Sequence, residues 1–408
     1  MATHRADLLA DVRIVDLTTT FMGPYATMQL ARLGADVIKV EDPKGDVVRG
    51  ILDHDGTGLG PIFLSANHGK RSLAVDLKDS RGREVLLELI ATADVFVTNM
   101  RPRALERLGI STEEILDRNP RCIVANLVGF GPGGRYDGTA AYDDVIQAVS
   151  GMASTQGGAD GPPAYVKSAI ADKTVGLVAA NSILAALFSR ERTGLGSAIT
   201  VPMFETMVAF NLLDHQGGRT FDPPRGDTGY PRLLSPFRRP YATSDGYLGV
   251  VVYTDRMWLS FFDLIGHPEL TDDPRFETIT GRTQHIDELY RLVDQELRRH
   301  PSEYWKKALA DADIPVVPVN SLDDLLDDPH LADVDFFESV EHPVAGPLRL
   351  APYPADFSTG GTGGNAPPAP VLGQHSRDIA AEIALPPSTI QSLIDDGVLV
   401  ETTIGVRS

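Results

Sequence analysis

Short apolar runs alternate with segments of helical pattern along the first 130 residues of the chain. These runs are rich in Val, Ile and Leu and have the length of buried strands. They lie at residues 12–17, 36–41, 72–77, 94–99 and 121–130. Helices are predicted at 23–34, where Pro24 suits the first turn and Gly34 the end, and at 82–93. This alternation predicts an α/β fold with a parallel sheet covered by helices on both faces.

The pattern changes after a long helix predicted at residues 173–192. Residues 217–247 are rich in Gly, Pro and Arg, which is typical of a linker, and compact helical segments follow. A second Gly- and Pro-rich passage at 346–376 precedes a final helical segment. We therefore expect four parts along the chain. They are a first part of a large domain at 1–216, a crossing at 217–247, a smaller domain at 248–330 and a return segment at 331–408 that completes the large domain.

Composition narrows the class of protein. Of the 408 residues, 42% are hydrophobic and 23% are charged, as in ordinary globular proteins. The net charge of −19 argues against a nucleic-acid partner, so an anionic ligand needs a local group of cations. Cys122 is the single cysteine and lies in an apolar run, which favours a reducing compartment. Without a secretory pattern or an apolar run of roughly 20 residues, we expect a cytoplasmic protein with no membrane segment.

Several common catalytic motifs are missing from the sequence. The first predicted strand-to-helix turn holds a single glycine where a dinucleotide-binding fingerprint has three, although Glu41 could hold a ribose. A dinucleotide oxidoreductase is therefore a distant alternative. The sequence has no Walker A motif, no G-x-S-x-G elbow and no close pair of histidine ligands, so we expect no metal. Carboxylates remain as the candidate reactive groups.

Asp172 is the most informative of these carboxylates. It follows the small apolar residues 169–171 and precedes the long helix expected to begin near Lys173. Backbone N–H groups and the positive end of the helix dipole would face it there. A carboxylate so placed can act as a nucleophile toward an activated acyl group. It can equally be a simple N-cap, and the position alone does not decide between the two.

The chain from about residue 10 to 380 resembles the class III CoA-transferases (CaiB/BaiF type), which include formyl-CoA transferase, carnitine CoA-transferase and α-methylacyl-CoA racemase. The resemblance rests on separated blocks at 15–50, 66–109, 129–151, 171–194 and 313–331. It implies a Rossmann-like large domain, a smaller α+β domain and a ring-shaped chain in an interlocked homodimer. It also implies CoA or acyl-CoA as cosubstrate, with no permanently bound cofactor, and Asp172 as the catalytic nucleophile.

Cations that could meet the CoA phosphates are predicted near the strand ends. They are Arg49, Lys70, Arg71, Arg101, Arg103 and Arg107. The resemblance places Asn99, Met100 and Arg107 at the nucleotide and Phe21 and Met22 at the reactive end of CoA. It also places Tyr142 and Asp143 at the CoA site.

CoA transfer to a carboxylic acid is the leading function. In the racemase a histidine stands at the position of Tyr142, and a phenol with an ordinary pKa near 10 is a poor substitute base. The racemase stays the second reading, and a noncatalytic acyl-CoA-binding protein the third. Residues 201–247 look closest to the branch with mesaconyl-CoA transferase, which suggests a C4 or C5 dicarboxylate. Arg238 and Arg239 could hold its second carboxylate or lie on a surface or interface.

Overall fold

The computed structural model describes residues 7–158, 161–355, 357–358 and 366–403, and the chain divides into two compact units. The larger unit takes Met1–Ser150, Val166–Val208 and His330–Ser408. The smaller unit takes Gly151–Tyr165 and Ala209–Pro329. The larger unit is therefore assembled from three separated stretches, and the chain returns to it after the smaller unit.

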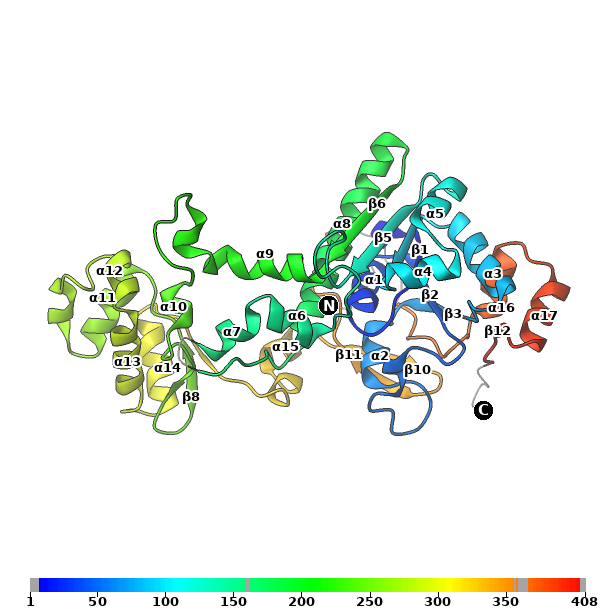
Figure 1. Ribbon diagram of the computed structural model, residues 1–408. Coiled ribbons are helices and arrows are strands. Elements are labelled where there is room, and N and C mark those ends of the chain that lie inside the picture. The colour runs from blue at the N-terminus through cyan, green and yellow to red at the C-terminus, as the bar shows by residue number, and fades with distance from the viewer. Residues whose placement is uncertain (1–6, 159–160, 356, 359–365, 404–408) are drawn as a thin grey trace. The chain divides into compact units, whose positions relative to one another are not determined.

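A seven-stranded sheet forms the centre of the larger unit (Figure 1). Its strand order is β12-β3-β2-β1-β4-β5-β6, and all neighbouring pairs are parallel except β12 with β3. The strands are β1 Arg13–Leu17, β2 Asp36–Glu41, β3 Lys70–Val75, β4 Val95–Thr98, β5 Ile123–Val128, β6 Ser197–Pro202 and β12 Leu399–Val400. The predicted α/β fold with a large parallel sheet is confirmed. Each apolar run expected as a strand overlaps one of β1 to β5, because a strand covered on both faces needs a continuous apolar run.

The larger unit also contains helices, several of which cover the sheet, and a two-stranded hairpin. The helices are α1 Met22–Arg32, α2 Pro61–Ala66, α3 Ser80–Ala91, α4 Pro102–Leu108, α5 Thr112–Arg118, α6 Asp143–Val149, α8 Ile170–Thr193, α15 Pro329–Asp333, α16 Ser376–Glu382 and α17 Pro387–Asp395. The hairpin consists of β10 Glu338–His342 and β11 Gly346–Leu350. Side chains such as Ile38, Leu73 and Phe96 are fully or almost fully buried between the sheet and its helices.

The long helix α8 begins at Ile170, earlier than the sequence pattern indicated. Its N-cap is Ala169, which makes no side-chain capping bond, so Asp172 lies inside the first turn and is not the cap. The helix packs against α1 at Gly176, where a Cβ atom would lie 2.8 Å from the Met22 carbonyl oxygen. By length and composition α8 is the one described helix that could cross a membrane. Its buried face, which includes Val175 and Ile183, instead covers the core of the larger unit.

The smaller unit is an α+β structure. Its sheet has the order β7-β8-β9 with antiparallel pairs, and its core contains the buried rings of Trp258, Phe261, Phe262 and Trp305. The strands are β7 Tyr241–Ala242, β8 Tyr247–Val250 and β9 Val316–Pro318. The helices are α7 Met152–Gly157, α10 Pro231–Leu234, α11 Asp255–Leu264, α12 Ile279–Gln284, α13 Ile286–Leu297 and α14 Ser302–Asp311, while α9 Met203–His215 begins in the larger unit and ends in this one.

Candidate active site

A cavity of about 590 Å³ lies within the larger unit, at the carboxyl ends of its parallel strands. In the sheet, β1 lies between β2 and β4. The chain adds β2 and β3 on one side of β1 and β4 to β6 on the other side, so the order of the strands reverses at β1. The connections after β1 and β4 leave the sheet toward opposite sides, and this divergence opens a crevice. Residues from both connections line the cavity, including Thr19 to Met22 after β1 and Asn99 to Pro102 after β4. The topology therefore creates the site.

Asp172 lines this cavity from the first turn of α8. Its side chain is half-buried, and among the described residues its carboxylate has no hydrogen-bond or ion-pair partner. Burial, together with the nearby charge of Asp143, raises the pKa of Asp172 from 3.8 to about 7. A poorly solvated carboxylate with free lone pairs is well suited to attack an electrophilic carbonyl carbon.

Asp143 holds the main chain at Asp172 without lining the cavity. Its Oδ1 accepts a hydrogen bond from the Asp172 N–H at 3.0 Å, which satisfies one of the free donors of the first turn of α8. Its Oδ2 accepts a 2.6 Å hydrogen bond from the buried amide of Gln147. The Gln147 oxygen in turn accepts from the Val166 N–H at 2.9 Å. Helix α6 thereby holds the segment that leads into Asp172.

The sequence-predicted residues Phe21, Met22, Asn99 and Met100 all line the same cavity as Asp172. Asn99 accepts from the Thr19 N–H at 3.0 Å and donates to the Thr19 carbonyl at 2.9 Å, which joins the two loops. Tyr142, which is 69% exposed, also lines the cavity, immediately before Asp143. These residues come from separate parts of the sequence and meet at the sheet edge.

The model of CoA-transferase family III matches residues 9–376 of the chain. The chain belongs to CoA-transferase family III. Formyl-CoA:oxalate CoA-transferase from Streptomyces avermitilis is 33% identical over 96% of this chain and 99% of its own length. Succinyl-CoA:glutarate CoA-transferase from Mus musculus is also 33% identical, over 96% of this chain and 90% of its own.

The solved structures agree with this membership. A CAIB/BAIF family protein from Brucella suis matches with a TM-score of 0.76 and 28% sequence identity, over 91% of this chain and 98% of its own. The family that the separated sequence blocks indicated is confirmed, and this protein is a CoA-transferase of family III. The cavity beside Asp172 is therefore the candidate active site of a transferase that uses CoA thioesters.

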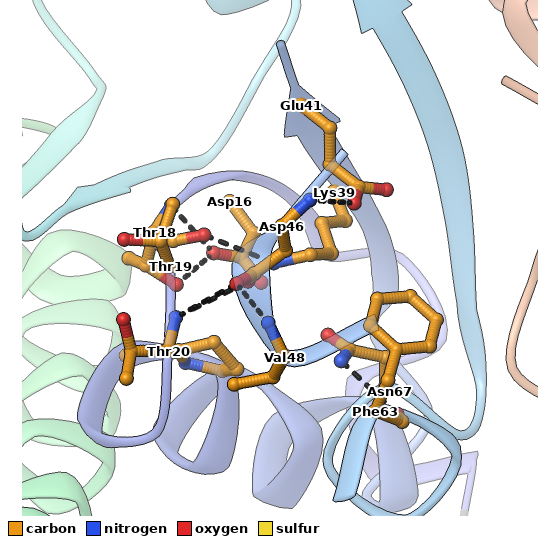
Figure 2. A network of polar contacts seen from close by, with 12 residues as sticks. Asp16, Thr18, Thr19, Thr20, Lys39, Glu41, Asp46, Val48, Phe63 and Asn67 are labelled. Atoms are coloured by element: carbon orange, nitrogen blue, oxygen red, sulfur yellow. Dashed lines mark hydrogen bonds and ion pairs between the residues drawn. The ribbon is translucent and has the colours of Figure 1, made fainter. Parts of the chain in front are cut away.

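Three cations expected near the CoA phosphates have protein partners in this transferase and do not line the cavity. Arg49 is buried and forms a pair with Glu41 at 2.7 Å, and it also donates to the Pro370 carbonyl. Lys70 is buried and pairs with Asp16 at 2.9 Å. Figure 2 shows the buried charged cluster that contains Asp16.

Arg71 binds Asp36 at 2.7 Å and Glu382 at 2.6 Å near the amino ends of the strands. The structure thus gives Arg49, Lys70 and Arg71 carboxylate partners within the protein, and their contact with a CoA phosphate stays a prediction. A paired guanidinium or ammonium would have to break its ion pair before it could bind a phosphate.

Arg103 and Arg107, two further predicted cations, do not line the cavity. Arg107 is on the last turn of α4 and its Nε donates to the Arg103 carbonyl at 3.2 Å. Arg238 and Arg239 belong to the smaller unit, where Arg239 lies 3.5 Å from Asp294.

Arg101 was among the cations predicted near the strand ends, but the resemblance to the family assigned it no contact with the nucleotide. It lines the cavity, is exposed, and among the described residues its guanidinium has no protein partner. It follows β4 directly and precedes Pro102, the first residue of α4. The sequence contained one indication that Arg101 could bind a phosphate, namely its position at the end of a predicted strand. The neighbouring Arg103 and Arg107 made this indication difficult to recognise.

Among the described residues there is no group of three or more His, Cys, Asp or Glu side chains placed to hold a metal ion. The polar side chains that line the cavity offer carboxylates, hydroxyls, the two amides of Asn99 and Asn126, and the guanidinium of Arg101. The chemistry we propose below uses only these groups and the substrates.

Proposed function

We propose that this protein transfers CoA from an acyl-CoA thioester to a free carboxylic acid, with Asp172 as the covalent nucleophile. The observation that carries the proposal is the carboxylate of Asp172, which lines the cavity of a family III CoA-transferase without a protein partner. A carboxylate conserves the transfer potential of a thioester in a covalent intermediate, whereas water would dissipate it.

The reaction proceeds in two matched halves. The Asp172 carboxylate attacks the thioester carbonyl, the C–S bond breaks, and CoA leaves as thiolate from a mixed anhydride. The thiolate then attacks the aspartyl carbonyl, which releases the first carboxylate and leaves an aspartyl-CoA thioester. The acceptor carboxylate attacks this thioester, and the thiolate released attacks the acceptor side of the new anhydride. The products are the new acyl-CoA and the free Asp172 carboxylate.

CoA would lie along the cavity wall formed by the loops after β1 and β4. Phe21, Met22, Asn99 and Met100 would contact it, and Arg101 would meet one of its phosphates as the free cation of the wall. The protein carries a net charge of −19, so one unpaired guanidinium in the cavity matters for an anionic ligand. Tyr142 would close the reactive end beside Asp172.

A dicarboxylate is the proposed acceptor class. The relatives above are named for oxalate and glutarate, both dicarboxylic acids, as acceptors and for formyl-CoA and succinyl-CoA as donors. Oxalate has two carbons, whereas succinate and glutarate have four and five, so the second relative supports a C4 or C5 dicarboxylate as the first choice of acceptor.

A homodimer is the proposed assembly. On α8 the side chains of Leu177 and Phe188 are 50% and 68% exposed, which is unusual for large apolar residues and fits a surface covered by a second copy. Light scattering on the purified chain measures the assembly, and a monomer at micromolar concentration contradicts it. An interlocked arrangement and a cytoplasmic location stay predictions from the sequence.

The proposed function is tested by incubating the protein with succinyl-CoA and a panel of free carboxylic acids. New acyl-CoA species detected by mass spectrometry support transfer. Asp172→Asn should abolish turnover and retain binding of succinyl-CoA, while Asp144→Asn removes an exposed acid of α6 and serves as the matched charge control.

A covalent label provides the second arm of this test. Hydroxylamine added during turnover should modify Asp172, and the modified peptide is identified by mass spectrometry. Full activity of Asp172→Asn contradicts the assignment. Deuterium exchange at the α-carbon of an acyl-CoA without CoA transfer would instead indicate a racemase.

A further inference from the structure

A cluster of buried charges lies beside the loop that forms one wall of the cavity (Figure 2). Lys39 and Asp46 have fully buried side chains and form an ion pair at 2.9 Å. Burial opposes the charged ammonium, yet the neighbouring carboxylates of Asp16 and Asp46 raise the pKa of Lys39 above its usual value. Lys39 therefore keeps its charge beside Asp46, and none of the chemical steps proposed above uses either residue.

Side chains hold the main chain of the loop after β1 at successive positions. Asp16 accepts from the Thr18 N–H at 3.1 Å, and Lys39 donates to the Thr18 carbonyl at 2.9 Å. Asn99 binds both main-chain groups of Thr19. The Thr20 N–H then donates to both carboxylate oxygens of Asp46, each at 3.2 Å. Figure 2 shows Asp46 between Lys39 and this loop.

Thr20 adopts a left-handed backbone conformation with φ of 73°. Such a conformation is unfavourable for a β-branched residue, so surrounding contacts have to maintain it. The carboxylate of Asp46 is the contact that reaches this residue, and it also accepts from the Val48 N–H at 3.2 Å. Asp46 therefore links the strained turn to the segment that follows β2.

The residues after this turn are Phe21 and Met22, which line the cavity together with Asp172. A Cβ atom on Gly176 of α8 would lie 2.8 Å from the Met22 carbonyl oxygen, so the loop also abuts the helix that carries Asp172. A change in the Thr20 turn would thus move a cavity wall and its contact with that helix.

We propose that the buried Lys39–Asp46 pair is a positioning pair for the transfer reaction, which holds the Thr20 turn so that Phe21 and Met22 shape the acyl site. The kinetic effect of this positioning rests on the proposed function. A buried ion pair is weak evidence for stability, because apolar residues of similar volume often serve the fold as well. In this pair Asp46 supplies an acceptor for the Thr20 N–H and Lys39 a donor for the Thr18 carbonyl, and an ionised carboxylate accepts a stronger hydrogen bond than a neutral amide.

Hydrogen exchange of the loop tests the positioning role independently of activity. Asp46→Asn should raise the exchange rate of the amides at residues 18–21 by about tenfold. The matched control is Asp94→Asn, which breaks the 2.8 Å pair with Arg190 before β4, at the opposite end of the strands from the cavity. Unchanged loop exchange in Asp46→Asn, or an equal rise in Asp94→Asn, overturns the inference.

Donor selectivity tests the consequence for the reaction. The ratio of kcat/KM for succinyl-CoA to that for acetyl-CoA does not depend on the folded fraction, so a merely structural defect leaves it unchanged. Asp46→Asn should move this ratio by about fivefold, and Asp94→Asn should not move it. The double variant Lys39→Met/Asp46→Asn removes both charges and should recover thermal stability without recovering the ratio. A wild-type ratio in that double variant overturns the inference.

These outcomes separate the two proposals. A wild-type protein that transfers CoA from neither donor contradicts the proposed function, and the exchange measurement still decides whether Asp46 holds the loop. Active wild-type protein with normal selectivity in Asp46→Asn contradicts the positioning role alone.

Discussion

The ionisation of Asp172 should make the stability of the protein depend on pH in a defined way. Burial, with the charge of Asp143 as a second cause, raises the pKa of Asp172 from 3.8 to about 7. Between these values the unfolded chain has lost the proton and the folded chain retains it. Because the folded state then binds more protons, its stability relative to the unfolded state falls as pH rises from about 4 to about 7 and is level above that.

The size of this loss follows from the shift. A rise of about 3 units corresponds to about 4 kcal/mol at pH above 7. The carboxyl group lines an open cavity, so water screens part of this cost, and we expect about 2 kcal/mol. Asp172→Asn removes the ionisable group, and among the described residues the wild-type carboxylate makes no hydrogen bond that the amide would lose. The variant should therefore be more stable than the wild type at about pH 8 and nearly equal at about pH 4.5.

Chemical denaturation of both proteins at these two pH values measures the difference in free energy of unfolding. Asp144→Asn, the exposed neighbour on α6, is the control and should show no comparable change with pH. A stability difference between Asp172→Asn and wild type that is the same at both pH values would refute the reasoning, because the raised pKa of Asp172 would then be absent.

Further predictions concern catalysis, packing and reactivity. In a pH–rate profile, the acid limb of kcat/KM should report the pKa of Asp172, about 7. Asp143→Asn removes a like charge near Asp172, so this variant should move the acid limb to lower pH. Gly176→Ala places a Cβ atom 2.8 Å from the Met22 carbonyl oxygen and should lower the free energy of unfolding by about 1–3 kcal/mol in a urea titration, whereas unchanged stability would contradict the close helix contact. Arg101→Gln should raise KM for the acyl-CoA donor about tenfold with kcat nearly kept, and an unchanged KM excludes the phosphate contact. Cys122 is fully buried, and burial raises its thiol pKa to about 12, so a thiol reagent should label it only after unfolding.

Local sequence patterns were sufficient to predict strands β1 to β5 and helices α1, α3 and α8 of the larger unit, and the blocks of resemblance indicated the family. The apolar runs at residues 36–41 and 72–77 overlap β2 and β3, because strands buried on both faces leave a continuous apolar signature in the sequence. The start of α8 was predicted too late, since Ile170 and Ala171 carry no capping signal. That error concealed that Asp172 lies within the helix.

The roles of the charged residues depended on partners distant in the sequence. Arg71 was predicted to be a phosphate ligand from its position in the sequence. In the fold it pairs at 2.6 Å with Glu382, which lies 311 residues further along the chain. Arg101 has no such partner among the described residues and lines the cavity.

By itself, then, the sequence determined the alternation of strands and helices, the family, and the acid at the start of the long helix, because these are properties of neighbouring residues. The tertiary structure alone decided which cations are neutralised by ion pairs, that Asp143 supports Asp172, and that Asp46 holds the Thr20 turn. Charge pairing and desolvation depend on distances in space, and residues far apart in the chain set those distances.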